Sequence, residues 1–158
     1  IIPYTESADK LPAISKYYDY DEGAPGKSAQ SNGITCIYRY AEVLLMYAEA
    51  STRATNTVNQ DALNAIQEVQ KRAGYQDRQI ELTTTTEPTA FLTAVSNERG
   101  WEFFAEMKRW FELVRLEKVK EVRAEEWDAS TFNTNHHYYF PVPYQQVDLA
   151  GWTNNAGY

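Results

Sequence analysis

The sequence has very little cysteine: Cys36 is the single one among 158 residues, so no disulfide can form within the chain. This excludes the small secreted folds that several disulfides hold together, and we expect Cys36 to be a buried structural thiol. The chain also lacks an apolar run of about 18 residues, the length that predicts a membrane-spanning helix. No CxxC, HExxH or glycine-rich phosphate-binding pattern occurs, and the adjacent His136 and His137 would point to opposite faces of an extended segment. We therefore expect no metal, no cofactor and no catalytic residues.

Basic residues are few compared with acidic ones. The chain has 15 lysines and arginines against 22 aspartates and glutamates, which gives a net charge of −7. Nucleic-acid backbones attract basic surfaces, and the sequence contains no basic stripe. We therefore expect no nucleic-acid partner.

Aromatic residues are abundant, with 12 tyrosines and 4 tryptophans. These side chains bury large areas while keeping a polar group, and the C–H faces of sugars stack on them. The candidates for ligand contact lie outside the predicted helices: Trp127 in a loop, and Tyr18 and Tyr20 ahead of a turn-rich segment. Three other aromatics fall inside a predicted helix and are expected in the core: Trp101, Trp110 and Phe111.

The hydrophobic pattern predicts a mostly α-helical chain of the size of one domain. Residues 1–35 are predicted to be extended or loop, and residues 36–75 to form a helical hairpin. Residues 88–122 are predicted to form one long helix, and residues 123–158 a loop followed by an extended tail.

The two helices of the predicted hairpin have different patterns. On the first, apolar side chains spread around much of the helix, which predicts burial on more than one side: Ile37, Tyr40, Ala41, Val43, Leu44, Leu45, Tyr47, Ala48 and Ala50. The second has Asn59 or Asp61 as its N-cap, Gly74 just beyond its end, and a single apolar stripe: Ala62, Ala65, Ile66, Val69 and Ala73. Such a pair is similar to one tetratricopeptide unit, which requires neighbouring helices to bury its faces.

Three glutamates, Glu98, Glu102 and Glu106, follow one another at four-residue spacing on the long predicted helix. Glycoside hydrolases use paired carboxylates, so a glycosidase is one interpretation. Carboxylates on one helix face lie side by side, however, and do not flank a substrate. Arg99 and Arg109 can compensate Glu102 and Glu106 at three-residue spacing, so we favour ion pairs that hold the helix to its neighbours.

Four stretches of the sequence form an ordered set of motifs. They are residues 38–50 (YRYAEVLLMYAEA), 62–75 (ALNAIQEVQKRAGY), 97–115 (NERGWEFFAEMKRWFELVR), and 139–143 (YFPVP) with the tail 154–158 (NNAGY). Together they resemble the RagB/SusD family over most of residues 35–158. The departures are small: Gly100 stands where that family usually has a basic residue, Met107 and Lys108 where it has a Gly-His region, and Ala156 where it has proline.

The resemblance implies the C-terminal portion of a SusD-like, tetratricopeptide-like helical scaffold with irregular loops and a short extended tail. It implies a lipoprotein at the cell surface of Bacteroidetes, attached to the outer membrane by an N-terminal lipid anchor that is absent from this chain. Such proteins bind a glycan or peptide nutrient, work with a TonB-dependent transporter of the SusC type and are not enzymes. The matched motifs are scaffold motifs, so no binding residue is transferred from them.

We therefore predict a nutrient-binding protein, with a glycan as the favoured ligand. A helical-repeat adaptor for protein partners is the alternative, and a glycoside hydrolase comes after it. The chain begins Ile-Ile-Pro without an initiator methionine or a leader, which we interpret as a processed or truncated product.

Overall fold

The computed structural model describes residue 16, residues 36–122 and residues 137–158. These residues are helical, with no strand in the described ranges, which confirms the mostly α fold class. The chain divides after Ala105 into two compact units. In the described part of the chain, no helix has both the length and the apolar character that crossing a bilayer requires.

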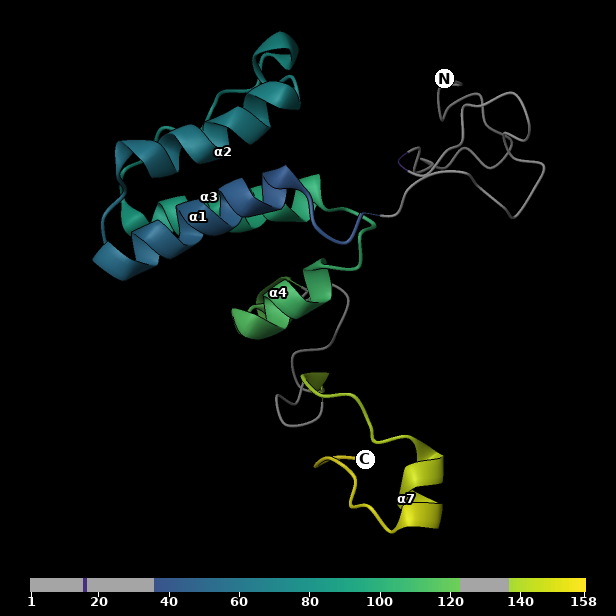
Figure 1. The fold of residues 1–158 in the computed structure, drawn as a ribbon. Coiled ribbons are helices and arrows are strands. Elements are labelled where there is room, and N and C mark those ends of the chain that lie inside the picture. Colours follow the sequence, from purple (N-terminus) through teal and green to yellow (C-terminus); the bar gives the residue numbers. More distant parts are fainter. Residues whose placement is uncertain (1–15, 17–35, 123–136) are drawn as a thin grey trace, which may run out of the picture. The chain divides into compact units, whose positions relative to one another are not determined.

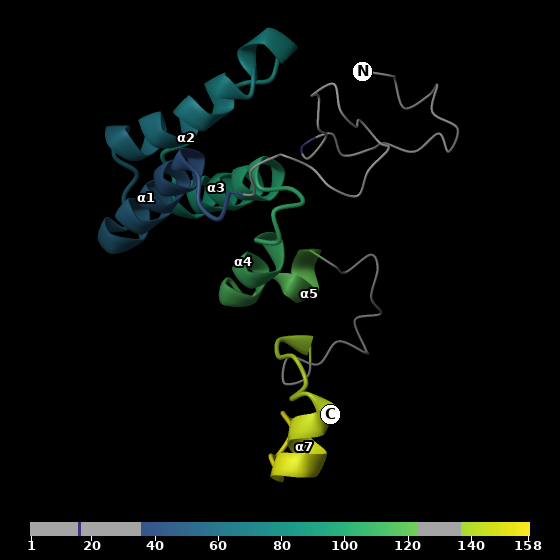
Figure 2. The same ribbon diagram turned by 45° about the vertical axis from the view of Figure 1, so that its right-hand side comes forward.

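The first unit contains three helices: α1 (Tyr40–Thr55), α2 (Gln60–Arg72) and α3 (Pro88–Glu102). A 3-10 turn, η2 (Gln76–Arg78), follows α2. Helices α1 and α2 run antiparallel, and α3 lies alongside them (Figures 1 and 2). The predicted hairpin is present, although its first helix begins at Tyr40 and not near residue 36. The beginning of α1 and the ends of α2 and α3 therefore share one end of the bundle.

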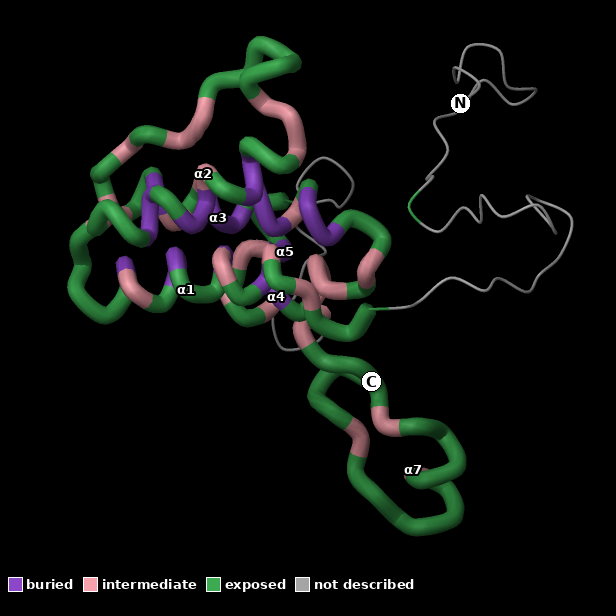
Figure 3. Tube along the Cα trace, turned by 45° about the horizontal axis from the view of Figure 1, so that its top comes forward, coloured by how far each residue is buried: buried purple, intermediate pink, exposed green. Residues whose placement is uncertain are grey.

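The core of this unit lies between the three helices, where buried segments face one another (Figure 3). It consists of apolar side chains from all of them and from the residue after α3: Leu45, Ala48, Ala62, Leu63, Ala65, Ile66, Val69, Phe91, Val95 and Phe103. The apolar stripe predicted on α2 is thus confirmed at Ala62, Ala65, Ile66 and Val69.

The prediction that α1 is buried on more than one side is wrong for this chain. Tyr40, Val43 and Tyr47 are exposed, while Leu45 and Ala48 are buried. Among the described helices, α1 packs mainly against α2 and α3, which leaves these three side chains exposed.

Local signals in the sequence fix both ends of α2. The side chain of Asn59 accepts a hydrogen bond from the backbone N–H of Ala62 at 2.8 Å, so Asn59, and not Asp61, is the N-cap. Gly74 follows the helix with a φ of +78°, in the left-handed region where glycine avoids the clash of a side chain.

The long helix predicted over residues 88–122 is wrong: the chain forms three shorter helices there. They are α3, which ends at Glu102, then α4 (Arg109–Arg115) and α5 (Val119–Val122). Distant side chains satisfy the backbone where α3 ends, because the carbonyl oxygen of Glu102 accepts from Lys16 Nζ at 2.8 Å and from Arg39 Nη2 at 3.1 Å. The carbonyl of Phe104 also accepts from Lys16, at 3.1 Å. These donors replace the hydrogen bonds that a continuing helix would supply.

Met107, in the segment between α3 and α4, has a φ of 59°. It is 89% exposed, so little packing depends on its side chain. Replacing Met107 with glycine should raise the free energy of unfolding by about 0.5–1 kcal/mol, because the left-handed strain exceeds the extra chain entropy of glycine. Urea denaturation measures the change. Met107→Ala keeps the β-carbon and should give no gain, and equal stability of the glycine and alanine variants would contradict the interpretation.

The second unit contains α4, α5 and α7 (Tyr144–Ala150). The tail predicted as extended therefore includes a short helix, which begins after Pro143 and is followed by Gly151, where φ is 68°. Residues of the tail bond back to the segment ahead of this helix. Asn155 Nδ2 donates to the carbonyl of Phe140 at 2.6 Å, and the Tyr158 hydroxyl donates to the carbonyl of Tyr139 at 2.9 Å.

Candidate functional site

Charged side chains meet at the end of the first unit where α1 begins and α2 and α3 end. The buried carboxylate of Glu102 accepts from Arg39 Nη1 at 2.7 Å and also pairs with Arg72. Arg39 precedes α1, and Arg72 is the last residue of α2. One carboxylate on α3 therefore ties all three helices together, and the ion-pair interpretation of the glutamates holds for Glu102.

The partners of these groups differ from those predicted by spacing along one helix. Arg99 lies 3.6 Å from Glu42 of α1, and both side chains are buried. The guanidinium of Arg99 also lies over the ring of Phe103, 5.3 Å from its centroid. The charged residues of α3 thus pair between helices.

Glu98 is buried more deeply, with 2% of its surface exposed. Its Oε2 accepts from the Tyr75 hydroxyl at 2.6 Å and from Gln70 Nε2 at 3.1 Å. Gln70 in turn donates to Thr83 Oγ1 at 2.8 Å and accepts from the Thr83 backbone N–H at 2.9 Å. This network fixes the segment after η2 against α2 and α3.

The pKa of the Tyr75 hydroxyl is raised above its ordinary value of 10.0. Burial disfavours the phenolate, the hydroxyl donates to Glu98, and the charges of Glu98 and Glu102 repel a second anion. A raised pKa in the folded state contributes stability that is complete below pH 10.0 and is lost as pH rises above it.

Tyr75→Phe should therefore change how stability depends on pH. Below about pH 10 we expect the variant to be less stable by about 1 kcal/mol, because Glu98 loses a hydrogen-bond donor. Above that pH the free energy of unfolding should fall more steeply for the original protein than for the variant. Urea denaturation at several pH values measures both slopes, and parallel curves would show that the hydroxyl is not coupled to folding.

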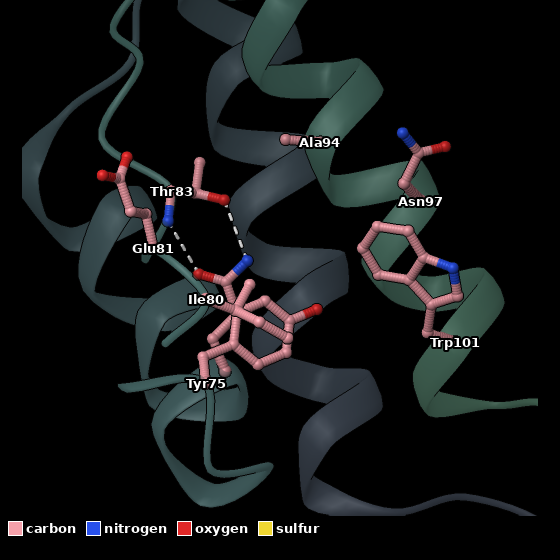
Figure 4. Close-up of a pocket in the computed structure, with 8 residues that line it drawn as sticks. Tyr75, Ile80, Glu81, Thr83, Ala94, Asn97 and Trp101 are labelled. Atoms are coloured by element: carbon pink, nitrogen blue, oxygen red, sulfur yellow. Dashed lines mark hydrogen bonds between the residues drawn. The ribbon is translucent and has the colours of Figure 1, made fainter. Parts of the chain in front are cut away.

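A pocket of about 370 Å³ lies beside this network, between α3 and the segment after η2. Asn97 and Trp101 from α3 form one side, and Tyr75, Glu81 and Thr83 lie opposite (Figure 4). The remaining lining residues are Gln70, Ile80 and Ala94. A second hollow, of about 510 Å³, shares Ile80 and Glu81 with the first; its other lining residues are Gln67, Gln76, Gln79, Leu82 and Thr84.

The polar side chains of the pocket fall into two groups. Gln70, Tyr75 and Thr83 already use their polar atoms in the network around Glu98. The side chains of Glu81, Asn97 and Trp101 have no hydrogen-bond partner within the described ranges. The first group holds the shape of the pocket, and the second is available to a ligand.

The aromatics selected from the sequence have different outcomes. Trp127, Tyr18 and Tyr20 lie outside the described residues, so their role in ligand binding stays a prediction. Trp101 was expected in the core but is 65% exposed, and Phe111 is exposed as well. Trp110 is half-buried, with its ring centroid 6.1 Å from that of Phe140.

The exposure of Trp101 could have been predicted from its place on the α3 helix. The buried positions of α3 include Phe91, Val95, Glu98 and Glu102, which follow the three- and four-residue steps of one helix face. Trp101 follows Glu98 by three residues, but it comes two residues after Arg99 and directly before Glu102, so its side chain lies to one side of the buried face.

Cys36 was expected to be buried, but it is exposed. It precedes the first residue of α1 by four positions and so lies outside the helix that was expected to cover it. In the described ranges, no group of three or more histidine, cysteine, aspartate or glutamate side chains could hold a metal ion. His136 lies outside these ranges.

Comparison with known families identifies the scaffold. The sequence profile of the SusD family matches residues 3–158, which is nearly the whole chain. The chain belongs to the SusD family. Two SusD-like proteins of Formosa agariphila are similar to it. SusD-like protein P25 is 27% identical over an alignment of 144 positions, which covers 88% of this chain and 26% of that protein. SusD-like protein P2 is 28% identical over an alignment of 164 positions, which covers 98% of this chain and 32% of that protein.

Solved SusD structures share the fold. A SusD superfamily protein from Parabacteroides distasonis superimposes with a TM-score of 0.70 at 29% identity, covering 85% of this chain and 29% of that one. A SusD homolog from Bacteroides thetaiotaomicron gives 0.63 at 27% identity, covering 77% of this chain and 26% of that one. The chain therefore has a SusD-type, tetratricopeptide-like helical fold and spans about a quarter to a third of the length of these relatives.

Proposed function

We propose that this chain is the C-terminal part of a glycan-binding protein that works at the cell surface in outer-membrane nutrient uptake. The match to the SusD family over residues 3–158 carries the proposal. The pocket with the exposed Trp101 supports it, because an exposed tryptophan beside unpaired polar groups suits a sugar.

The partners follow from the same proposal. The whole protein is attached to the outer membrane by a lipid at its N-terminus and associates with a TonB-dependent transporter of the SusC type. A glycan is the favoured nutrient, with a peptide as the other class. Nucleic acid does not fit a chain with a net charge of −7.

The protein binds its ligand without cleaving it. Glu98 and Glu102, the pair that a glycoside hydrolase would need, are buried and bonded to groups of the three-helix unit. The pocket beside them contains one carboxylate, Glu81, in its lining. Glycosidases place two carboxyl groups on either side of the scissile bond, an arrangement that this lining does not provide.

The experiment combines copurification with binding. The whole protein is purified from detergent-solubilised outer membranes under its native promoter, and copurifying membrane proteins are identified by mass spectrometry. Calorimetry then measures binding to a panel of polysaccharides and peptides. A TonB-dependent transporter in the purified complex and a bound glycan are the expected results, and the absence of both would contradict the proposal.

A protein-binding adaptor is the second candidate, and the exposed apolar side of α1 favours it. Tyr40, Val43, Met46 and Tyr47 lie on α1 with their side chains exposed. A soluble protein partner that is lost in Tyr40→Lys/Tyr47→Lys, together with no affinity for any glycan, would favour the adaptor over the glycan-binding protein.

A further inference from the structure

We propose that the pocket beside Trp101 is a subsite for one non-acidic sugar ring, with a face of the ring stacked on the indole. The inference rests on the proposed function, which supplies sugar as the class of ligand. It adds that the sugar contacts Trp101 and that the sugar carries no negative charge. The three-helix unit would then bind part of the ligand as well as form part of the scaffold.

The size of the pocket and its aromatic wall suit a small ring. At about 370 Å³ it lies within the range of about 300–1,000 Å³ for small-molecule sites, near the lower limit. Trp101 is 65% exposed and borders the pocket, with Ile80 and Ala94 as apolar neighbours in the lining. The C–H face of a pyranose is flat and apolar, so stacking it on the indole removes apolar surface from water on both partners.

Two unpaired polar side chains are placed to bind hydroxyl groups. Asn97 precedes Trp101 by four residues on α3, which puts both on one side of the helix. Its amide donates and accepts, as a sugar hydroxyl does, and Glu81 can accept from hydroxyls on the other side of the pocket. A sugar ring held between α3 and the segment after η2 would contact all three of these side chains.

The bonded groups behind the pocket keep it in shape. Thr83 is held by two hydrogen bonds to Gln70, and Tyr75 is held by Glu98. Because these side chains are already bonded within the protein, they need little further ordering when a ligand binds.

The charges around the pocket select against acidic sugars. The lining contains Glu81 and no lysine, arginine or histidine, and the carboxylate of Glu98 lies behind Tyr75. A uronic acid or a sulfated sugar would bring a further negative charge next to these two carboxylates, with no cation in the lining to pair with it. Neutral sugars avoid this repulsion, and amino sugars would be attracted by Glu81.

The first test observes Trp101 directly in the whole protein. Its indole N–H signal in a ¹H–¹⁵N spectrum is assigned by its loss in Trp101→Phe. The probes are methyl glucoside, methyl galactoside, methyl mannoside, glucosamine and glucuronate. We expect the signal to shift with at least one non-acidic sugar and to stay in place with glucuronate. No shift with any sugar, or an equal shift with glucuronate, would overturn the inference.

The second test uses matched variants. Trp101→Ala should weaken binding of the responding sugar at least about tenfold, as for other aromatic anchors, while Phe104→Ala should not change it. Phe104 is 60% exposed and lies outside the lining, so it controls for the loss of a surface aromatic. Glu81→Gln should allow glucuronate to bind, whereas Glu68→Gln, at an exposed position outside the lining, should not.

The two proposals fail in different ways. Calorimetry with the polysaccharide panel is repeated on Trp101→Ala. Unchanged polysaccharide affinity, with no response of the Trp101 signal, would overturn the subsite and leave glycan binding intact. A response of Trp101 to sugars in a protein that binds no polysaccharide would support the subsite and contradict the proposed function.

Discussion

Replacing Glu42 with alanine should lower the free energy of unfolding by about 3–5 kcal/mol. Glu42 of α1 and Arg99 of α3 lie 3.6 Å apart, and their side chains are only 7% and 8% exposed. Alanine would remove this carboxylate from the buried guanidinium of Arg99, and breaking a buried ion pair by removing one partner costs more than the pair itself contributes. Urea denaturation of the variant and the original protein measures the difference.

The double variant Glu42→Met/Arg99→Met is the matched control. It removes both charges and keeps apolar volume, and the methionine at position 99 can still contact the ring of Phe103. Most of the lost stability should therefore return. A single variant within about 1 kcal/mol of the original protein, or a double variant less stable than the single one, would contradict this account of the pair.

Phe91→Ala should cost a similar amount, about 3–5 kcal/mol, for a different reason. Phe91 on α3 has no exposed surface and belongs to the core between the three helices. Its removal loses the transfer free energy of the ring and leaves a cavity that the neighbouring helices can only partly fill. Thermal or urea denaturation gives the loss.

Phe104→Ala is the control for Phe91→Ala, since it deletes the same side chain from an exposed position of the same unit. We expect it to change stability by less than about 0.5 kcal/mol. Equal effects at the two positions would mean that the three-helix core is not formed as described.

Sequence reasoning succeeded where the determinants are local. The stripe on α2 and Gly74 beyond its end can be predicted within one or two helical turns, and the structure confirms both; of the two predicted N-cap candidates, the structure selects Asn59. Residue spacing and side-chain chemistry are sufficient there, because no distant residue decides the outcome.

The end of α3 was not predicted from the sequence. The groups that satisfy the carbonyl of Glu102 are Lys16 and Arg39, which are 86 and 63 residues away along the chain. The hydrophobic pattern of residues 88–122 does not depend on Lys16 or Arg39, so it predicted one continuous helix. Tertiary contacts overrode a local preference that was real but weak.

The pocket could not be predicted from the sequence either, because it also depends on contacts between separate segments of the chain. The segment after η2 was predicted to be a polar loop, and the hydrogen bonds of Thr83 with Gln70 and Gln67 place it against α2. Asn97 and Trp101 lie in a motif that identified the family, but they occupy positions off its buried face. Trp127, Tyr18 and Tyr20 remain predictions for ligand contact.

The most direct test of the central claim is a titration followed by product analysis. The whole protein is titrated with the polysaccharide panel in a calorimeter, and the reducing ends of each mixture are then counted after prolonged incubation. The account predicts heat of binding with at least one glycan and no increase in reducing ends. An increase that disappears in Glu98→Gln and Glu102→Gln, or no binding to any glycan, would contradict it.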